Sequence, residues 1–279
     1  MPSETAQKAV EAALEETFMK AAVFAAPGKI EVKEVAKLVI DGKNQAIIRV
    51  VRASVCGSDL WWYRGIAKRE ANTLVGHEAI GVVEQVSADV SQIKAGDSVI
   101  VPFTHGCGHC VACLNGFEGN CLNQKPGSNG GYQAEFMKYE PADSGLVKIL
   151  GAPADYTDEQ LASLQTLSDV MATVFHAAKS ADSSIEQAGQ IARPGAVIGR
   201  VGVPHAERKS NQLFWKNIGL RGGIASVTKP DNELLLKAVL DGEINPGKVF
   251  TKSFDLDHTA DAYAAMDQRQ AIKSLLVID

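Results

Sequence analysis

The chain has 279 residues, 46% hydrophobic and 22% charged, which is ordinary for a globular protein and allows one large domain or two modest ones. Its formal net charge of -5 at pH 7 argues against a nucleic-acid-binding surface, which is usually basic. No run of 18 apolar residues exists, so no membrane span is expected.

Residues 3–18 are predicted to form a helix, because Ser3 offers an N-cap and apolar residues recur at four-residue spacing. A surface extension is the simpler interpretation, and a partner-binding helix is the alternative. The segment is acidic and has no unbroken apolar core, so neither a secretory signal nor a mitochondrial presequence is expected. A cytoplasmic location is the resulting expectation.

The next part of the chain contains short segments rich in β-branched residues, which predict strands over 21–24, 46–53, 81–86 and 98–101. Strands this close, joined by glycine-rich turns, indicate a compact antiparallel or barrel-like domain.

After residue 155 the chain alternates helix and strand, as α/β folds do. Helices are predicted over 158–167, 169–180, 185–192, 232–240 and 258–269. Strands are predicted over 196–203, 217–224 and 274–279.

Four of the five cysteines lie close together, in the pattern C-x2-C-x2-C-x7-C. They are Cys107, Cys110, Cys113 and Cys121. A disulfide-rich secreted protein would carry more cysteines in a shorter chain, so reduced thiolates are expected. The spacing lets one loop turn four sulfurs toward a tetrahedral site, which suits Zn²⁺. Tight turns are supplied by Gly106, Gly108, Gly116 and Gly119. We predict a closed, structural zinc site, with redox dithiols or chance cysteines as the alternative.

A second candidate metal site is dispersed in the sequence. Cys56 follows a predicted strand in C-G-S-D, and His77 lies in G-H-E twenty-one residues later. Alone, each has an ordinary explanation as a small buried residue or a hydrogen-bonded core histidine. Beside a zinc loop, a Cys, a His, one further ligand and water match the open coordination of a catalytic zinc.

Five motifs in this order resemble the zinc alcohol dehydrogenases of the medium-chain dehydrogenase/reductase family. They are V-C-G-S-D-L, G-H-E, A-G-D-S-V, the four-cysteine loop and L-S-D-V-M-A-T. The resemblance runs over residues 19–176 and 185–279. It implies a mixed α/β fold, with a GroES-like, β-rich catalytic domain and a Rossmann coenzyme domain.

The resemblance also implies boundaries between these parts. A helical extension is expected over 1–18 and the GroES-like catalytic domain over 19–168. A truncated Rossmann remnant is expected over 169–240. Residues 241–279 are expected to return to the catalytic domain.

Matching positions carry roles over from the family. The catalytic zinc would be held by Cys56, His77 and Asp169, and Glu78 would be able to exchange onto the metal. Asp169 has a competing interpretation as the N-cap of the helix that follows it. Two zinc ions per chain are therefore expected, one in each site.

Other matching positions concern the substrate. Ser58 would accept the alcohol proton, and Trp61 stands where some relatives continue the proton relay with a histidine. The relay here would use water or end at Ser58. Trp61, Trp62 and Phe103 match pocket-lining positions, and aromatic core packing is the alternative for them.

The coenzyme half departs from the family pattern. No G-x-G-x-x-G occurs in the sequence, although a nicotinamide dinucleotide is normally held by that turn. Residues 181–183 lead directly into the helix over 185–192, so about two βαβ units of about 30 residues each are absent. Thr173, Val201, Gly202 and Val203 match nicotinamide-contacting positions, but NAD(P) binding is expected to be poor. The two remaining strands would expose their edges, which predicts a homo-oligomer.

Three functions remain open at this point. The first is an alcohol dehydrogenase acting on a small alcohol or aldehyde with a nicotinamide cofactor, with little or no activity in this form. The second is a zinc-binding scaffold or pseudoenzyme that self-associates, since nicotinamide contacts alone supply too little binding energy for a dinucleotide. The third is a zinc hydrolase or lyase, for which the sequence places no general base beyond Glu78.

Overall fold

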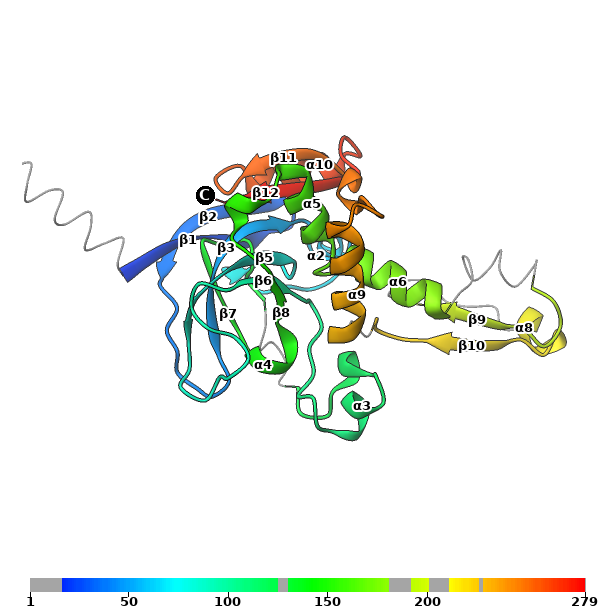
Figure 1. The fold of residues 1–279 in the computed structure, drawn as a ribbon. Coiled ribbons are helices and arrows are strands. Elements are labelled where there is room, and N and C mark those ends of the chain that lie inside the picture. The colour runs from blue at the N-terminus through cyan, green and yellow to red at the C-terminus, as the bar shows by residue number, and fades with distance from the viewer. Residues whose placement is uncertain (1–16, 125–129, 181–191, 201–210, 226–227, 279) are drawn as a thin grey trace, which may run out of the picture.

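The computed structural model describes residues 17–124, 130–180, 192–200, 211–225 and 228–278 (Figure 1). Most of the helix predicted over 3–18 and of the helix predicted over 185–192 lies outside these residues. At the end of the first segment the prediction is wrong, because Phe18 begins a β-strand and not the last turn of a helix.

Twelve strands are found in the described residues. They are β1 (Phe18–Ala26), β2 (Lys29–Ala36), β3 (Ala46–Ser54), β4 (Thr73–Leu74), β5 (Ala79–Val86), β6 (Ser98–Val101), β7 (Phe136–Tyr139), β8 (Val147–Ile149), β9 (Val197–Arg200), β10 (Gly219–Gly222), β11 (Phe250–Asp255) and β12 (Lys273–Val277).

The helices are mostly short and gather in the second half of the chain. They are α2 (Asp59–Tyr63), α3 (Val111–Leu114), α4 (Ala142–Gly145), α5 (Asp158–Thr166), α6 (Val170–Ser180), α8 (Asn211–Trp215), α9 (Lys229–Leu240) and α10 (Thr259–Asp267), with 3-10 turns η1 (Glu118–Asn120), η2 (Pro153–Asp155) and η3 (Pro246–Val249). None of the described helices is long and apolar enough to cross a lipid bilayer.

A seven-stranded sheet organises the main body. Its order is β11-β12-β3-β5-β6-β8, and β7 pairs with the first half of β3. All pairings in it are antiparallel except β11 with β12. A separate antiparallel sheet has the order β2-β1-β4. The last strand, β12, therefore pairs with β3, so residues near the C-terminus lie beside the strand that precedes Cys56.

Both faces of the large sheet are covered, which explains why β3 is buried along nearly its whole length. Ile48 and Val50 belong to the main core. Ile80 and Ile100 belong to a second core that includes residues of α5 and α9. The predicted strands lie within β1, β3, β5 and β6. The strand β2 was missed because its sequence is highly charged and half exposed, which hides the alternation of a buried strand.

The starts of two helices beside the sheet are explained by the local sequence. Thr157 is the N-cap of α5, and its side chain accepts a hydrogen bond from the backbone N–H of Gln160. The side-chain oxygen of Gln160 in turn accepts a hydrogen bond from the backbone N–H of Thr157. Thr228 caps α9 by one such bond, which its side chain accepts from the backbone N–H of Asp231. Apolar side chains of both helices pack with those of β5 and β6 in the second core.

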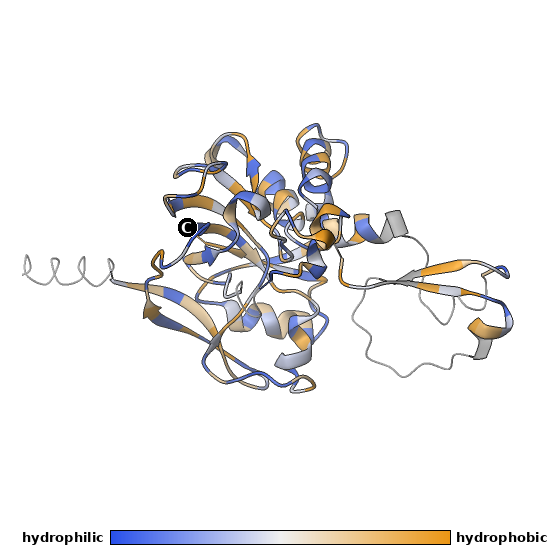
Figure 2. Cartoon of the chain, turned by 90° about the horizontal axis from the view of Figure 1, so that it is seen from below, coloured by the Kyte–Doolittle hydropathy of each residue, from blue (hydrophilic) through white to orange (hydrophobic). Residues whose placement is uncertain are grey.

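A parallel pair of strands, β9 and β10, projects from the main body together with α8 (Figures 1 and 2). We refer to the described residues 192–200 and 211–225 as the arm. Its buried apolar core consists of Ile198 and Ile218, with Leu213 packed beside them. Sequence analysis did not predict α8, which occupies part of the segment between the two strands. The strand predicted over 217–224 is shorter as β10, because Asn217 adopts a left-handed conformation with φ of 52°.

Candidate metal centres

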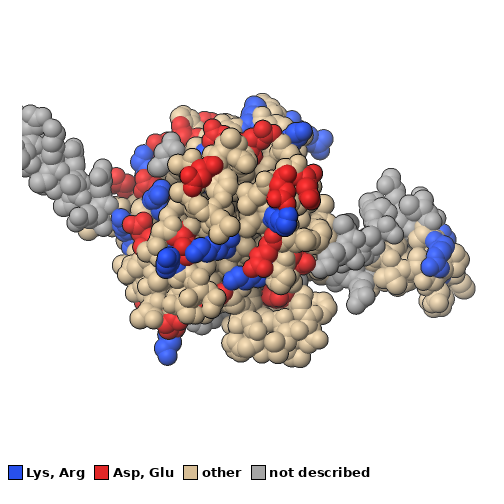
Figure 3. Space-filling view, viewed as in Figure 1, with Lys and Arg blue, Asp and Glu red and all other residues tan. Residues whose placement is uncertain are grey.

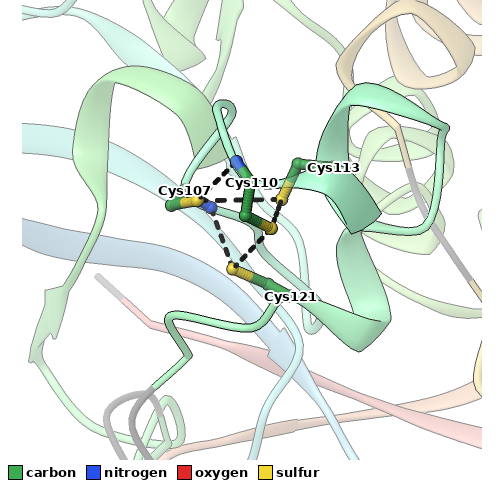
Figure 4. A group of neighbouring side chains, drawn as sticks. All are labelled: Cys107, Cys110, Cys113 and Cys121. Atoms are coloured by element: carbon green, nitrogen blue, oxygen red, sulfur yellow. Dashed lines mark hydrogen bonds between the residues drawn. The ribbon is translucent and has the colours of Figure 1, made fainter.

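The four-cysteine loop brings its sulfurs together. Figure 4 shows the four side chains facing a common point. The Sγ atom of Cys110 lies 3.4 Å from that of Cys113 and 3.9 Å from that of Cys121, and Cys107 lies 4.0 Å from Cys113. All four sulfurs lie within 4.8 Å of one another. Four thiolates at such distances resemble a closed zinc site.

Backbone geometry adapts the loop to this arrangement. Gly106 approaches the cluster so closely that a Cβ atom there would lie 2.6 Å from the Cys113 sulfur. Gly108 and Gly116 both have φ of 77°, in the left-handed region that favours glycine. Burial opposes ionisation of Cys107, but the backbone N–H groups of its neighbours and the side-chain amide of Asn123 lower its pKa to about 6. The loop thus favours a thiolate at this position.

The surface of this lobe is unusually apolar. Figure 3 shows few charged side chains around α3 in that view. Exposed apolar side chains are contributed by Val111, Leu114, Phe117 and Leu122. A lobe this small has almost no core of its own, so a bound metal would supply much of its stability.

The second cluster gathers residues that are far apart in sequence. Cys56 follows β3, Glu78 immediately precedes β5 together with His77, and Asp169 immediately precedes α6. One donor atom from each of the four lies within 4.8 Å of the others. Adjacent strands β3 and β5 bring the first three together, and the turn between α5 and α6 adds the fourth.

Two distances define the centre of this cluster. Asp169 Oδ2 lies 3.3 Å from His77 Nε2 and 3.4 Å from Cys56 Sγ. Its other oxygen, Oδ1, accepts a hydrogen bond of 2.8 Å from the hydroxyl of Thr173. Asp169 also stands directly before α6, as its N-cap interpretation required, but the carboxylate oxygen Oδ2 faces the other donors. Thr173, predicted to contact nicotinamide, therefore also orients Asp169.

His77 is oriented from its other side by Asp59, which sequence analysis did not single out. His77 Nδ1 lies 3.4 Å from Asp59 Oδ1, which leaves Nε2 facing the cluster. Burial opposes a charged imidazole, but Asp59, Asp169 and Cys56 outweigh it and hold the pKa of His77 well above its usual value. The cluster therefore attracts positive charge.

Glu78 is fully buried and is held by two partners that are far apart in sequence. Lys273 Nζ lies 2.9 Å from Oε1 and 2.7 Å from Oε2, and the hydroxyl of Ser54 donates to Oε2. Burial raises the pKa of Glu78, and Lys273 opposes that shift. Lys273 was also missed from sequence, because a lone lysine in an apolar strand carries no motif.

The donor set suits Zn²⁺, which is bound by thiolate sulfur, imidazole nitrogen and carboxylate oxygen. Burial, followed by the charge of Glu78, raises the pKa of the Cys56 thiol. A divalent cation would reverse this, because it stabilises the thiolate and the two carboxylates together. The residues therefore fit the metal.

The predicted substrate residues fall into two groups. Ser58 is exposed at the start of α2, two residues from Cys56. Phe103 is half-buried, and its ring centroid lies 6.2 Å from that of His77. Trp61 is half-buried on α2. Trp62, in contrast, belongs to the main core against Phe24 and Tyr263, so its interpretation as a pocket residue is wrong. Val201, Gly202 and Val203 lie outside the described residues.

Known proteins resemble this chain in sequence and in fold. Residues 42–150 match the family described as the alcohol dehydrogenase GroES-like domain. A glutathione-independent formaldehyde dehydrogenase of Pseudomonas aeruginosa is 33% identical over 177 residues, which cover 57% of this chain and 44% of that one. An alcohol dehydrogenase of Geobacillus stearothermophilus is 31% identical over 239 residues, covering 82% of this chain and 64% of that one. The chain is therefore similar to zinc-type alcohol dehydrogenases, and its residues 42–150 match their GroES-like domain.

Solved structures share the fold. The alcohol dehydrogenase TADH from Thermus sp. ATN1 superposes with a TM-score of 0.78 at 21% identity, covering 94% of this chain and 100% of that one. The mixed α/β fold with a GroES-like domain is thereby confirmed. A zinc-type alcohol dehydrogenase-like protein of Bacillus subtilis is 32% identical over 172 residues, which cover 56% of this chain and 44% of that one. The chain spans less than half the length of the formaldehyde dehydrogenases it matches.

Proposed function

We propose that the chain is an alcohol dehydrogenase-like zinc protein that retains the catalytic metal site and has lost effective dinucleotide binding. The observation that carries the first part is the approach of Cys56, His77, Glu78 and Asp169, with all four donor atoms within 4.8 Å. Cys56, His77 and Asp169 would hold the catalytic zinc. The four-cysteine loop would hold a second zinc that orders its lobe.

A small alcohol or aldehyde is the substrate class that this site would take. Zinc supplies polarisation of a substrate oxygen when it is bound. Ser58 lies near Cys56 and is exposed, so it would accept the alcohol proton and pass it to water. Trp61 and Phe103 would provide apolar contacts beside the reacting carbon.

The second part of the proposal rests on the coenzyme half. The sequence contains no G-x-G-x-x-G, and two parallel strands are described where a full Rossmann sheet would have about six. The domain division proposed here follows: catalytic domain 19–168, truncated remnant 169–240 and returning segment 241–279. An internal loss of about two βαβ units accounts for the short remnant.

The test combines metal analysis with cofactor titration. Purified protein should contain zinc at both sites and should oxidise small alcohols slowly or not at all with NAD or NADP. Zinc at the Cys56 site together with rapid NAD(P)-dependent turnover would disprove the loss of cofactor binding. An absence of zinc at that site would instead disprove the proposed metal ligands.

A self-associating scaffold remains a second candidate, favoured by one observation. Phe214 and Trp215 on the arm are 76% and 81% exposed. Large apolar side chains with this exposure favour contact with a second copy, and the arm would provide it.

A further inference from the structure

Lys273 stands out because it is a buried cation that no role described above uses. Its side chain is 5% exposed, and it comes from β12, far in sequence from the metal-site motifs. The ammonium contacts both oxygens of Glu78 and donates a 3.0 Å hydrogen bond to the carbonyl oxygen of Val55. These contacts use the hydrogen-bonding capacity of the ammonium group.

The charges of the cluster explain why a cation is needed there. The thiolate of Cys56 and the carboxylates of Glu78 and Asp169 would carry three negative charges, whereas zinc carries two positive charges. With His77 neutral as a metal ligand, these donors would retain one excess negative charge in a largely buried site, and the carboxylate of Asp59 beside His77 adds another. The ammonium of Lys273 offsets one of these negative charges from a position 2.7 Å from Glu78. A buried charge without such a partner is strongly destabilising.

The position of Glu78 matters for access to the metal. Its Oε1 atom lies 4.0 Å from His77 Nε2, so the carboxylate is close enough to become a fourth metal ligand. A fourth protein ligand would close the site, whereas a catalytic zinc keeps one position for substrate. The partners of Glu78 therefore decide whether that position is open.

We propose that Lys273 is a positioning residue that holds Glu78 off the metal and keeps the fourth coordination position open. The inference rests on the proposed zinc at Cys56, His77 and Asp169. While Lys273 is present, both oxygens of Glu78 have a charged partner. Without it, the metal becomes the nearest cation, and Glu78 moves onto it.

The test uses protein with Co²⁺ at the Cys56 site and Zn²⁺ in the four-cysteine loop, because the visible spectrum of Co²⁺ reports its ligands. Imidazole is the probe for the open position, since the form that binds a metal is neutral and its binding does not depend directly on the charge of residue 273. In Lys273→Met we expect imidazole to bind at least tenfold more weakly and the Co²⁺ spectrum to change. Release of Co²⁺ to a chelator should become slower.

Two further variants separate this role from a structural one. Lys148→Met is the matched control, because Lys148 also pairs with a buried carboxylate, that of Asp97 at 2.7 Å, outside the metal cluster. It should leave imidazole binding unchanged. Adding Glu78→Gln to Lys273→Met removes the buried pair as a unit, which proteins tolerate better than removal of one partner. The double variant should regain imidazole binding close to the wild-type value.

The outcomes are distinct even if Lys273→Met does not fold. Glu78→Gln alone should bind imidazole within about threefold of wild type, because Glu78 is already off the metal. A tenfold gain in this variant, or an unchanged spectrum and imidazole affinity in folded Lys273→Met, would overturn the role of Lys273. A wild-type chain that holds no Co²⁺ at the Cys56 site would instead disprove the metal site and, with it, this inference.

Discussion

One carboxylate, that of Asp59, contacts two of the proposed zinc ligands at once. Its Oδ1 atom lies 3.4 Å from His77 Nδ1, and its Oδ2 atom accepts a 3.0 Å hydrogen bond from the backbone N–H of Cys56. The side chain is only 4% exposed, so both contacts are shielded from water. Asp59 therefore fixes the imidazole ring and the start of α2 relative to each other.

The first prediction follows from this contact. Asp59→Asn keeps the size of the side chain but loses the negative charge facing His77. Because such outer partners orient metal-bound histidines and raise their basicity, zinc affinity at the Cys56 site should fall about 10–100-fold. Competition with a chelator measures this, and the zinc of the four-cysteine loop serves as the internal control. Equal weakening of both sites would indicate general unfolding and contradict the assigned role.

The second prediction concerns the number and the roles of the zinc ions. Metal analysis should find about two zinc ions per chain. Cys110→Ser should remove one zinc and lower the melting temperature, because structural zinc binding contributes directly to folding. Cys56→Ser should also remove one zinc but leave the fold largely intact. Unfolding of both variants to the same extent would contradict the assignment of a structural role to the four-cysteine site alone.

The sequence predicted the two metal clusters better than their surroundings. Cys107 and its three partners are close in sequence, and Cys56 and His77 occur in recognisable motifs, so short-range patterns located them. Asp59 and Lys273 were missed because their roles arise from tertiary contacts. Lys273 reaches Glu78 only because β12 pairs with β3, and the sequence pattern of β12 does not predict that pairing.

For the fold, too, elements with a clear local pattern were predicted and elements that depend on tertiary contacts were missed. Strands with alternating or continuous apolar residues, such as β3 and β5, were predicted within about two residues. The charged strand β2 and the short strands β7 and β8 were missed, since their stability comes from sheet neighbours and not from local propensity.

The third prediction concerns the cofactor. NAD(H) and NADP(H) should bind no tighter than the millimolar range, equivalent to about −4 kcal/mol. The reason is the absence from the sequence of the glycine-rich turn that leads into a pyrophosphate-binding helix N-terminus. Isothermal titration with each dinucleotide tests this. A micromolar dissociation constant for either one would be incompatible with the loss of the dinucleotide site.

The fourth prediction concerns pH and Asp97. This carboxylate is 8% exposed, lies 2.7 Å from Lys148 Nζ and accepts a 3.0 Å bond from the backbone of Lys94. Burial raises its pKa, but these partners outweigh burial and hold the pKa below its usual value. A depressed folded-state pKa stabilises the protein above the unfolded value of about 3.9, and the contribution is lost as the pH falls through the folded value.

Asp97→Asn should therefore lower the free energy of unfolding by about 1 kcal/mol at neutral pH, a modest value because Lys148 is partly exposed. The difference from wild type should shrink as the pH falls below about 4. Denaturant unfolding at several pH values measures it, and acid-induced zinc loss cancels because it affects both proteins. A difference that stays constant with pH would mean that the charge of Asp97 is not responsible.

The last prediction concerns the arm. Its strands β9 and β10 form a parallel pair with Ile198 and Ile218 as their buried core, whereas Phe214 and Trp215 are exposed. An isolated two-stranded ribbon is marginally stable in water and its edges are sticky. We therefore expect hydrogen exchange to show strong protection in β3 and β5 and weak protection in β9, unless copies of the chain associate through the arm.

Substitution distinguishes an arm that is free in a monomer from an arm through which copies of the chain associate. Replacing Phe214 and Trp215 together by serine should shift any dimer toward monomer in analytical ultracentrifugation, because burial of their apolar surface is the driving force for association. Ile272→Ser is the matched control, since Ile272 is 71% exposed on the main body. It should leave the assembly unchanged. A monodisperse wild-type monomer with strong protection in both β9 and β10 would contradict the prediction, because the described arm core is too small to stabilise those strands alone.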